Sequence, residues 1–505
     1  MTHEVVVVGA GVGGLTTAAL LAARGLDVCV LEKESRGGGC ATTFERFGYE
    51  FETTAGLYAG WGADDIHARV FSELPVALPE ARRLAPAYVV RLPDATEVRV
   101  GAGDDGDNGD VEFERELSRA FPECAHAAIN FYRELTPIGE ALQRSARRTP
   151  ELATMGMFAR MKLLAAEARH ASRVLALQTH TAGEHLTAAS TRFRRFIDAQ
   201  LQIYAGCASD ECAYLHAAVA LNLPRRGLYA INGGASALTR ALTDSIKLSG
   251  GRIRFDTTAL RLAFDANGRA IGVDLLSGES VRATRAVVSN LTVWDTYGKL
   301  VGASRTPGQL RERLKSARGW GAYLLYLGAD EEAVARLPAE RILALDSWQE
   351  GEIYDAARSQ FMFSASPAWD SERAPAGKRA VTLSLYTEAA DWFAYHTDES
   401  EHETQDQVML EACWARLHAA LPELGAGVEV IETATPRIFY EQTRRKLGMV
   451  GGIPQTLANS GANAFTHRTP FPNLYTVGDT VFPGNGLAAV TQSALIAANE
   501  IAPRK

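Results

Sequence analysis

The chain opens on an unbroken apolar run at residues 5–8, four valines that are followed at once by glycines. Four consecutive valines cannot form an amphipathic surface element, so they predict a short parallel strand buried on both faces. Residues 15–24 predict a helix that Gly25 ends, and residues 28–31 predict a second buried strand. Strand, glycine turn, helix and strand in this order predict the first unit of an α/β fold.

Further along the chain the pattern changes twice. Residues 87–92 and 97–100 predict a strand pair, and apolar residues at helical spacing follow over 111–182. Alternating strands and helices return over 227–290, and strand, glycines and helix appear again over 473–500. The α/β domain is therefore expected to be interrupted and resumed. Its predicted segments are 1–75, 226–298 and 436–505, and a substrate domain is predicted from 76–225, which is mostly helical, and 299–435.

The first turn carries a recognisable glycine spacing. Gly9, Gly11 and Gly14 form G-x-G-x-x-G between the first strand and the first helix, and Glu32 ends the second strand. Such glycines permit a tight turn, the approach of a pyrophosphate and close helix packing, while the acid binds a ribose hydroxyl. The helix N-terminus favours the phosphates. The unit therefore predicts dinucleotide binding, and Glu32 disfavours a 2′-phosphate.

Composition and charge narrow the setting. The chain has 505 residues, 47% hydrophobic and 22% charged, with a net charge of −8, which is typical of a soluble globular protein of two or three domains. The negative charge argues against nucleic acid as a partner. No secretory signal and no spanning apolar stretch is recognisable, so a cytoplasmic protein is expected. Residues 155–175 mix apolar and basic groups at helical spacing, which leaves a lid, a core helix or a membrane-surface helix open.

No metal site is expected. The six cysteines form no C-x-x-C pair and have no histidine companions at zinc spacing. The acidic, glycine-rich tip at 101–110 lacks two of the ligands that a calcium loop requires, so it predicts a solvated turn.

The residues after Glu32 separate FAD from NAD. Residues 36–43, RGGGCATT, resemble the R-x-G-G-R-x-x-[ST] element of flavoproteins in the amine oxidase and phytoene desaturase superfamily. Four positions match this element: Arg36, Gly38, Gly39 and Thr43. Cys40 stands where many members have the second arginine.

Other stretches extend the resemblance over the whole chain. They are residues 38–44 and 196–204, which resemble carotenoid end-group desaturases, residues 288–296, which resemble the isomerase and saturase branch, and residues 477–486, which all branches share. The chain thus resembles the FAD-dependent carotenoid desaturase and isomerase family, which includes phytoene desaturases, carotenoid cis-trans isomerases and retinol saturases. It is most similar to the end-group desaturases.

The resemblance implies a fold and a set of cofactor contacts. The implied fold is an α/β, Rossmann-type FAD-binding domain with an interleaved α+β substrate domain. The residues that it assigns to FAD are Gly9, Gly11, Gly13, Gly14, Glu32, Lys33, Arg36, Gly38, Gly39, Thr43, Ala259, Gly478, Asp479, Gly486 and Leu487.

The resemblance also implies a reaction: desaturation of a carotenoid or related long apolar polyene by hydride transfer to flavin N5. The cofactor carries the reactive atom, so no catalytic triad is needed. Candidate side chains beside the substrate are Tyr58, Tyr229, Glu52 and His67, with Glu50 as a further proton acceptor and Trp61 and Phe482 as further aromatic residues.

Several alternatives stay open from the sequence. The protein could isomerise a polyene with reduced FAD, or dehydrogenate a polyene acyl intermediate of a natural product. A non-enzymatic escort for flavin or a prenyl lipid is a further class, against which the intact glycine loop at 484–487 argues. The pattern leaves the substrate, the electron acceptor, the oligomeric state and any attachment to a membrane surface undecided.

Overall fold

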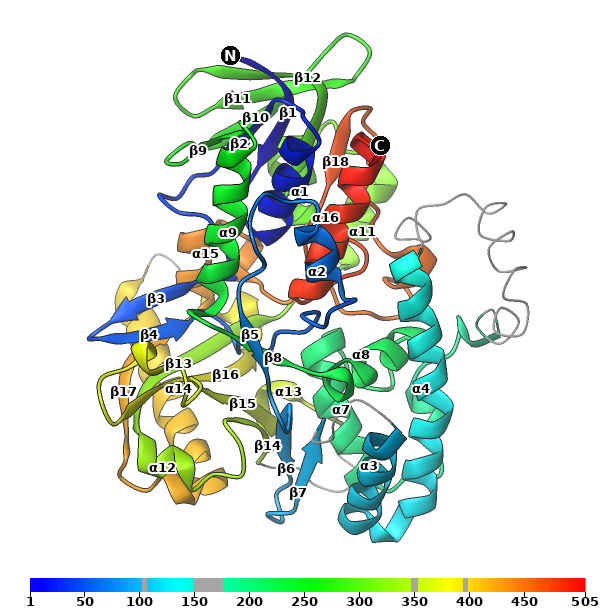
Figure 1. Cartoon of the computed structure of the whole chain (residues 1–505), viewed down its shortest axis with the longest axis vertical. Coiled ribbons are helices and arrows are strands. Elements are labelled where there is room, and N and C mark those ends of the chain that lie inside the picture. The colour runs from blue at the N-terminus through cyan, green and yellow to red at the C-terminus, as the bar shows by residue number, and fades with distance from the viewer. Residues whose placement is uncertain (102–106, 149–173, 175, 347–352, 394–397, 505) are drawn as a thin grey trace.

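The computed structural model describes residues 1–101, 107–148, 174, 176–346, 353–393 and 398–504. Within these residues two seven-stranded sheets lie at opposite ends of the molecule, and a group of helices stands beside the second sheet (Figure 1). The predicted helix around 155–175 falls almost wholly outside the described residues.

The first sheet holds the valine run. Its strand order is β10-β11-β12-β1-β2-β9, and β18 also pairs with β12. The strands are β1 (Thr2–Val8), β2 (Val28–Leu31), β9 (Arg252–Arg254), β10 (Ala259–Phe264), β11 (Ala270–Leu275), β12 (Ser280–Ser289) and β18 (Leu474–Thr476). β9, β2, β1, β12 and β18 run parallel, whereas β10 and β11 form an antiparallel hairpin beside the first half of β12.

Both faces of this sheet are covered, which explains four apolar residues in a row. Val5 and Val7 pack beneath α1 (Val12–Ala23), α9 (Gly234–Leu248) and α16 (Leu487–Ile501). Val6 and Val8 pack on the opposite face against α10 (Val293–Asp295) and the turn that follows it. Because successive residues of a strand point to opposite faces, a doubly covered strand needs an apolar side chain at every position.

The second sheet has the order β17-β13-β16-β15-β14-β6-β7 and is antiparallel except between β14 and β6. Its strands are β6 (Tyr88–Arg91), β7 (Glu97–Val100), β13 (Gly321–Asp330), β14 (Arg341–Leu345), β15 (Gln360–Ala365), β16 (Lys378–Thr387) and β17 (Val428–Ala434). α14 (Glu399–Ala420) and α12 (Glu331–Ala335) cover one face. The other face turns toward the helices and the cavity described below.

The helical part consists of α3 (Asp107–Ala120), α4 (Ala125–Arg148), α7 (Thr191–Ala205) and α8 (Tyr214–Arg226). The sequence pattern predicted helix from residue 111 onward without a break. The structure ends α3 at Ala120, because Phe121 precedes Pro122 and a residue before proline is held out of the helical region. These helices share one core with β6 and β7.

Short elements connect the two ends. They are the hairpin of β3 (Thr43–Arg46) and β4 (Tyr49–Glu52), the pair of β5 (Ala81–Arg83) and β8 (Tyr229–Ile231), α2 (Ile66–Phe71), α13 (Ala356–Ser359), α15 (Pro436–Thr443) and α11 (Gly308–Ser316). Among the described helices none is long and apolar enough to cross a membrane.

The predicted start of the first helix differs from the structure. α1 begins at Val12 rather than at residue 15, so Gly13 and Gly14 belong to its first turn. Strands of the first sheet come from 1–75, 226–298 and 436–505, and those of the second sheet come from the two segments between.

Candidate active site

One cavity of about 1730 Å³ extends from the carboxyl ends of β1, β2 and β12 to the second sheet and helices α7 and α8. Ligand pockets usually measure about 300–1,000 Å³, so this space can hold a dinucleotide and a second molecule. The predicted residues that line it are Gly9, Gly11, Gly13, Glu32, Lys33, Arg36, Gly38, Gly39, Tyr58, Ala259, Gly478, Asp479, Gly486 and Leu487. The predicted residues outside its lining are Gly14, Thr43, Glu52, His67 and Tyr229.

The glycines form a cradle with no room for side chains. A Cβ on Gly14 would lie 2.1 Å from the Gly9 carbonyl oxygen, so Gly14 serves the packing of α1 on β1. A Cβ on Gly11 or Gly13 would lie 2.5 or 2.6 Å from the side-chain amide of Asn290. Leu15 donates its N–H to Gly11, so the earlier N–H groups of α1 point out of the helix N-terminus toward the cavity. This is the geometry that a diphosphate requires.

Glu32 lies where a ribose would be recognised. Its carboxylate accepts the N–H of Ala10 at 2.7 Å and that of Glu34 at 2.9 Å, and these bonds fix it at the end of β2. The remaining lone pairs of the carboxylate are free to accept ribose hydroxyls. Lys33 pairs with Glu34, and Ala259 opens β10 on the same side of the cavity.

The loop at 36–43 continues the cradle. Gly38 donates its N–H to the Ala10 carbonyl at 2.8 Å, and Arg36 reaches the Thr43 carbonyl at 3.2 Å. The Thr43 hydroxyl bonds Glu50 at 2.5 Å and Ser236 at 2.8 Å. Thr43 therefore fixes the loop from behind, where its hydroxyl does not border the cavity.

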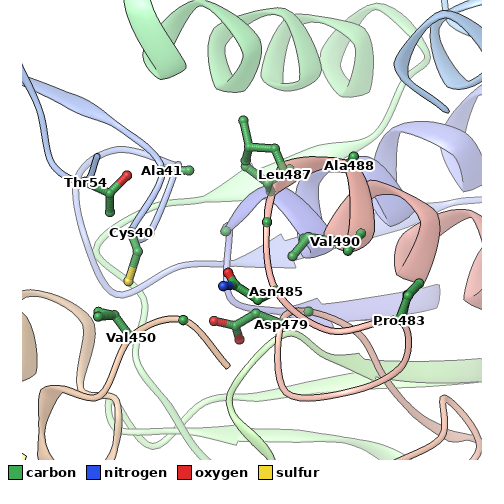
Figure 2. Close-up of a pocket in the computed structure, with 18 of the residues that line it drawn as sticks. Cys40, Ala41, Thr54, Val450, Asp479, Pro483, Asn485, Leu487, Ala488 and Val490 are labelled. Carbon is green, nitrogen blue, oxygen red and sulfur yellow. The ribbon is translucent and has the colours of Figure 1, made fainter. Parts of the chain in front are cut away.

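Asp479 follows β18 and carries an ion pair. Its carboxylate accepts two bonds from the Arg445 guanidinium, at 2.8 and 3.3 Å. In Figure 2 this carboxylate points to the side of the cavity on which Cys40 and Val450 lie, whereas the Leu487 side chain extends away from it. Burial raises the pKa of the Cys40 thiol, with Arg445 opposing and Asp479 adding to that rise. The three groups therefore share one region of the cavity.

Asn290 and Arg445, which both line the cavity beside the glycine cradle, were not singled out from the sequence. Asn290 comes directly after β12, beside β1, and its amide fills the space among Gly11, Gly13 and Gly478. Its place at the carboxyl end of a central parallel strand was a usable signal. No local pattern marked Arg445, which reaches the site from the loop after α15.

Tyr58 borders the cavity, but its acidic partner does not. The Tyr58 hydroxyl donates to Glu52 at 2.6 Å, and Glu52 also accepts the Ala235 N–H at 3.3 Å and approaches Arg373 at 3.5 Å. Burial, and then the Glu52 charge, raises the pKa of Tyr58 well above its usual value. Glu52 and Glu50 line a separate small cavity, so the structure places both away from the substrate space.

His67 and Tyr229 also lie behind the lining. His67 is fully buried, packs its ring 4.0 Å from that of Trp61, and has a pKa lowered by burial to about 3. Tyr229 contributes its N–H to the Tyr58 carbonyl at 2.7 Å. Neither is positioned to meet a molecule in the cavity, whereas Phe482 lines it.

Apart from Ile203 and Tyr204, which lie in the stretch 196–204, the substrate wall comes from residues that the sequence did not single out. Across the second sheet, Leu324, Ser384 and Met362 are register partners on β13, β16 and β15, and all three line the cavity. The helices add Ile203 and Tyr204 of α7 and Leu215, His216, Val219, Ala220 and Leu223 of α8. Arg226, at the end of α8 and 3.7 Å from Asp65, is the one charged lining residue that these described strands and helices contribute.

His216 is the one imidazole among the described residues of the lining. Its Nε2 lies 3.4 Å from the Tyr204 carbonyl, which can only accept, so Nε2 carries the proton. Burial lowers the pKa of His216 to about 4, with the Tyr204 carbonyl opposing the effect. The ring is therefore neutral at pH 7, and Nδ1 has no partner within the described part of the chain.

Fold and site together define an FAD-binding oxidoreductase of the α/β class. The family profile described as "Flavin containing amine oxidoreductase" matches residues 12–502, and the chain belongs to this family. The predicted superfamily, fold class and cofactor are thereby confirmed. Within the described residues no group of three or more histidine, cysteine or acidic side chains could hold a metal ion.

Individual relatives are distant but extend over the whole chain. The chain is 24% identical to "Prolycopene isomerase, chloroplastic" of Daucus carota, covering 99% of this chain and 80% of that protein. It is also 24% identical to "All-trans-retinol 13,14-reductase" of Homo sapiens, with 99% and 86% covered.

Solved structures show the same fold. An oxidoreductase from Methanosarcina mazei is 16% identical and superposes with a TM-score of 0.62, covering 98% of this chain and 99% of that one. A putrescine oxidase bound to putrescine is 15% identical, with a TM-score of 0.62 and full coverage of both chains.

Proposed function

We propose that this protein is an FAD-dependent enzyme acting on the carbon–carbon bonds of a long, apolar, conjugated isoprenoid. The observation that carries the proposal is the cavity wall built by β13, β15, β16, α7 and α8, which is mainly aliphatic and aromatic. Such a wall aligns an extended hydrocarbon beside the cofactor and keeps water out. The names of the listed relatives, a prolycopene isomerase and a retinol reductase, support the same substrate class.

Within this class the sequence predicts desaturation, and we retain that reaction as the first candidate. FAD, when bound, supplies the two-electron acceptor that removal of a hydride from an allylic carbon needs. The chain must then take a proton from the neighbouring carbon. His216 Nδ1 is a neutral acceptor in the cavity wall, held in the required tautomer by Tyr204, and we assign this step to it.

A charged amine fits the cavity less well, although the family name and the putrescine oxidase concern amines. An ammonium group in an apolar site needs a carboxylate partner. The described lining residues of β13, β15, β16, α7 and α8 include no aspartate or glutamate. An apolar chain leaves no charge unpaired there.

Cis–trans isomerisation is the second candidate. The similarity of this chain to the prolycopene isomerases of Daucus carota and Arabidopsis thaliana favours it, since each aligns with 99% of this chain. Isomerisation leaves the mass of the polyene unchanged, whereas desaturation lowers it by two hydrogens.

The test is anaerobic incubation of the FAD-loaded protein with a carotenoid or a shorter polyene, followed by mass spectrometry and absorbance. Desaturation should bleach oxidised flavin once per new double bond and shift the polyene spectrum to longer wavelength. Activity only after dithionite reduction, with no change of mass, would replace desaturation by isomerisation. Turnover of amines but of no polyene would refute the substrate class.

Location follows from the substrate in this proposal. A cytoplasmic protein that visits a membrane surface would collect an isoprenoid from the bilayer. Vesicle flotation checks this, and recovery of all protein in the bottom fraction at low salt would contradict it.

A further inference from the structure

We propose that Arg445 is an FAD-anchoring residue that supplies, from a distant part of the chain, the cation that Cys40 does not provide. The proposal concerns the cofactor half of the site and therefore deepens the assignment of FAD. It does not depend on which polyene the enzyme uses.

The first support is the unfinished hydrogen bonding of the guanidinium. Arginine has five N–H groups. The Nε–H of Arg445 donates to the Met449 carbonyl at 2.6 Å, and one N–H on each terminal nitrogen is directed at Asp479. Two N–H groups remain without an acceptor among the described residues, although the side chain is only 16% exposed. A buried donor needs a partner, and Arg445 lines the cavity.

The second support is the kind of ligand that this part of the cavity fits. Arg445 shares the lining with Gly11, Gly38 and Gly478, where α1 presents its N-terminus and the glycines exclude side chains. A diphosphate–ribityl segment brings anionic and hydroxyl oxygens to such a cradle. Arginine binds oxygen anions with a rigid fork of donors, so the two remaining N–H groups suit this segment.

The third support is the position of Cys40 beside this guanidinium. All three residues, Cys40, Arg445 and Asp479, line the cavity, and Asp479 is hydrogen-bonded to Arg445. Burial raises the pKa of the Cys40 thiol, the Arg445 charge opposes that rise and the Asp479 charge adds to it. A thiol is short and uncharged, so it leaves room for the Arg445 fork. An arginine at position 40 would bring a second guanidinium into the same region and would oppose the first by like-charge repulsion.

The local backbone explains how Arg445 reaches the site. α15 ends at Arg444, whose φ of 56° turns the chain sharply, and Arg445 follows in an extended conformation. Gly452 then passes so close to Asp479 that a Cβ would lie 2.3 Å from the Asp479 carbonyl oxygen. The loop is thereby packed against the start of the flavin loop, which holds the Arg445–Asp479 pair in place.

The experiment measures FAD affinity by fluorescence titration of flavin-free protein, with no polyene present. Arg445→Ala should weaken FAD binding at least tenfold. Arg445→Lys keeps the charge without the fork of donors, so its FAD affinity should lie between those of the parent and Arg445→Ala. Arg318→Ala is the matched control because it removes the same charge from an exposed loop position outside the cavity lining. It should stay within about twofold of the parent. Equal affinity of Arg445→Ala and the parent would overturn the proposal.

Two double variants separate a direct contact from an indirect one. If Arg445 only neutralises Asp479, then Asp479→Asn combined with Arg445→Ala should bind FAD as tightly as Asp479→Asn alone, and that result would overturn the proposal. We expect the double variant to bind FAD at least tenfold more weakly than Asp479→Asn alone.

The second double variant tests the role of position 40. Cys40→Arg combined with Arg445→Ala should recover at least threefold over Arg445→Ala, because the cation returns from the other side of the site. If FAD affinity did not recover, the claim that Arg445 takes the place of an arginine at position 40 would be refuted. Thermal unfolding of each flavin-free variant shows that it is folded. Loss of FAD affinity is thus distinguishable from loss of polyene turnover at saturating FAD, which tests the proposed function.

Discussion

The two halves of the cavity recognise their ligands by different means. The cofactor half uses backbone: glycines at 9–14 and 37–39, the N-terminus of α1, and a few fixed carboxylates. The substrate half uses separate side chains contributed by β13, β15, β16, α7 and α8. A backbone site demands a contiguous motif, whereas a side-chain wall can be assembled from any elements that meet there. The cofactor half can therefore be predicted from a sequence, whereas the substrate half cannot.

Acidification should have the largest effect on the free energy of unfolding, and this effect is not confined to one half of the cavity. Burial lowers the pKa of His67 to about 3 and that of His216 and His467 to about 4. Below pH 6.5 these three histidines become protonated in the unfolded chain but stay neutral in the folded chain. The free energy of unfolding therefore falls as the pH falls from 6.5 toward 4. Each histidine should cost roughly 2 kcal/mol at pH 5. Thermal unfolding between pH 7 and pH 5 measures the loss. A flat profile would contradict the buried neutral histidines.

The next effect isolates the backbone half. Gly14→Ala places a methyl group 2.1 Å from the Gly9 carbonyl oxygen and must separate α1 from β1. We expect a loss of about 1–3 kcal/mol in stability and little bound FAD. Gly298→Ala is the control, since a Cβ there meets nothing within 4 Å. Flavin content and thermal unfolding are measured on both. Normal FAD retention by Gly14→Ala would show that the cradle tolerates change.

His216→Ala should separate the halves functionally. If Nδ1 takes the proton, kcat on a polyene should fall at least tenfold, because the described wall offers no other imidazole. FAD affinity should stay within about twofold, since His216 lies on α8 and not in the cradle. His67→Ala, equally a histidine but behind the lining, should change kcat much less. An unchanged kcat for His216→Ala would remove this residue from the mechanism.

Asn290→Ala should have a smaller effect, confined to the cofactor half. The amide lies against Gly11, Gly13 and Gly478 and can bond FAD on either its oxygen or its nitrogen. The loss of one hydrogen bond of this kind corresponds to about 0.5–1.5 kcal/mol, or roughly threefold to tenfold in affinity. Fluorescence titration with FAD measures it. A change in polyene preference with unaltered FAD affinity would place Asn290 in the other half.

Ser384→Ala should have the smallest effect. The Ser384 hydroxyl is buried beside the substrate wall and has no hydrogen-bond partner among the described residues. Its removal should leave stability unchanged or raise it by up to about 1 kcal/mol. Ser366→Ala is the contrast. The Ser366 oxygen accepts the Ala380 N–H at 3.1 Å, so its removal should lower stability. Chemical denaturation compares the two. A marked loss in Ser384→Ala would mean that the hydroxyl is paired.

The same division explains what the sequence could predict. The glycine spacing, Glu32 and the strand–glycine–helix unit at the chain's end led to the fold, to FAD and to most of the cradle. Each of these rests on backbone geometry that only certain residues allow, such as Gly14 against Gly9. Asn290 was within reach because strand ends of parallel sheets face the ligand.

The remaining residues depend on tertiary packing. His216 is one polar residue in a helix whose facing cannot be known until α7 and the second sheet are placed. Arg445 acts across a loop whose direction depends on the left-handed turn at Arg444. Glu52 and His67 were reasonable proton acceptors by residue type, yet burial behind the lining removes them from the substrate space.

The pairing of β18 with β12 has a consequence for how the protein is made. β18, Asp479 and α16 come from the segment 474–501, while β1 and α1, which they cover, are synthesised first. Until that segment leaves the ribosome, β12 keeps an open edge, α1 keeps a bare apolar face, and the cradle lacks one wall. FAD should therefore be captured only after residues 474–501 have emerged, so ribosome-bound chains stalled before residue 474 should not retain flavin.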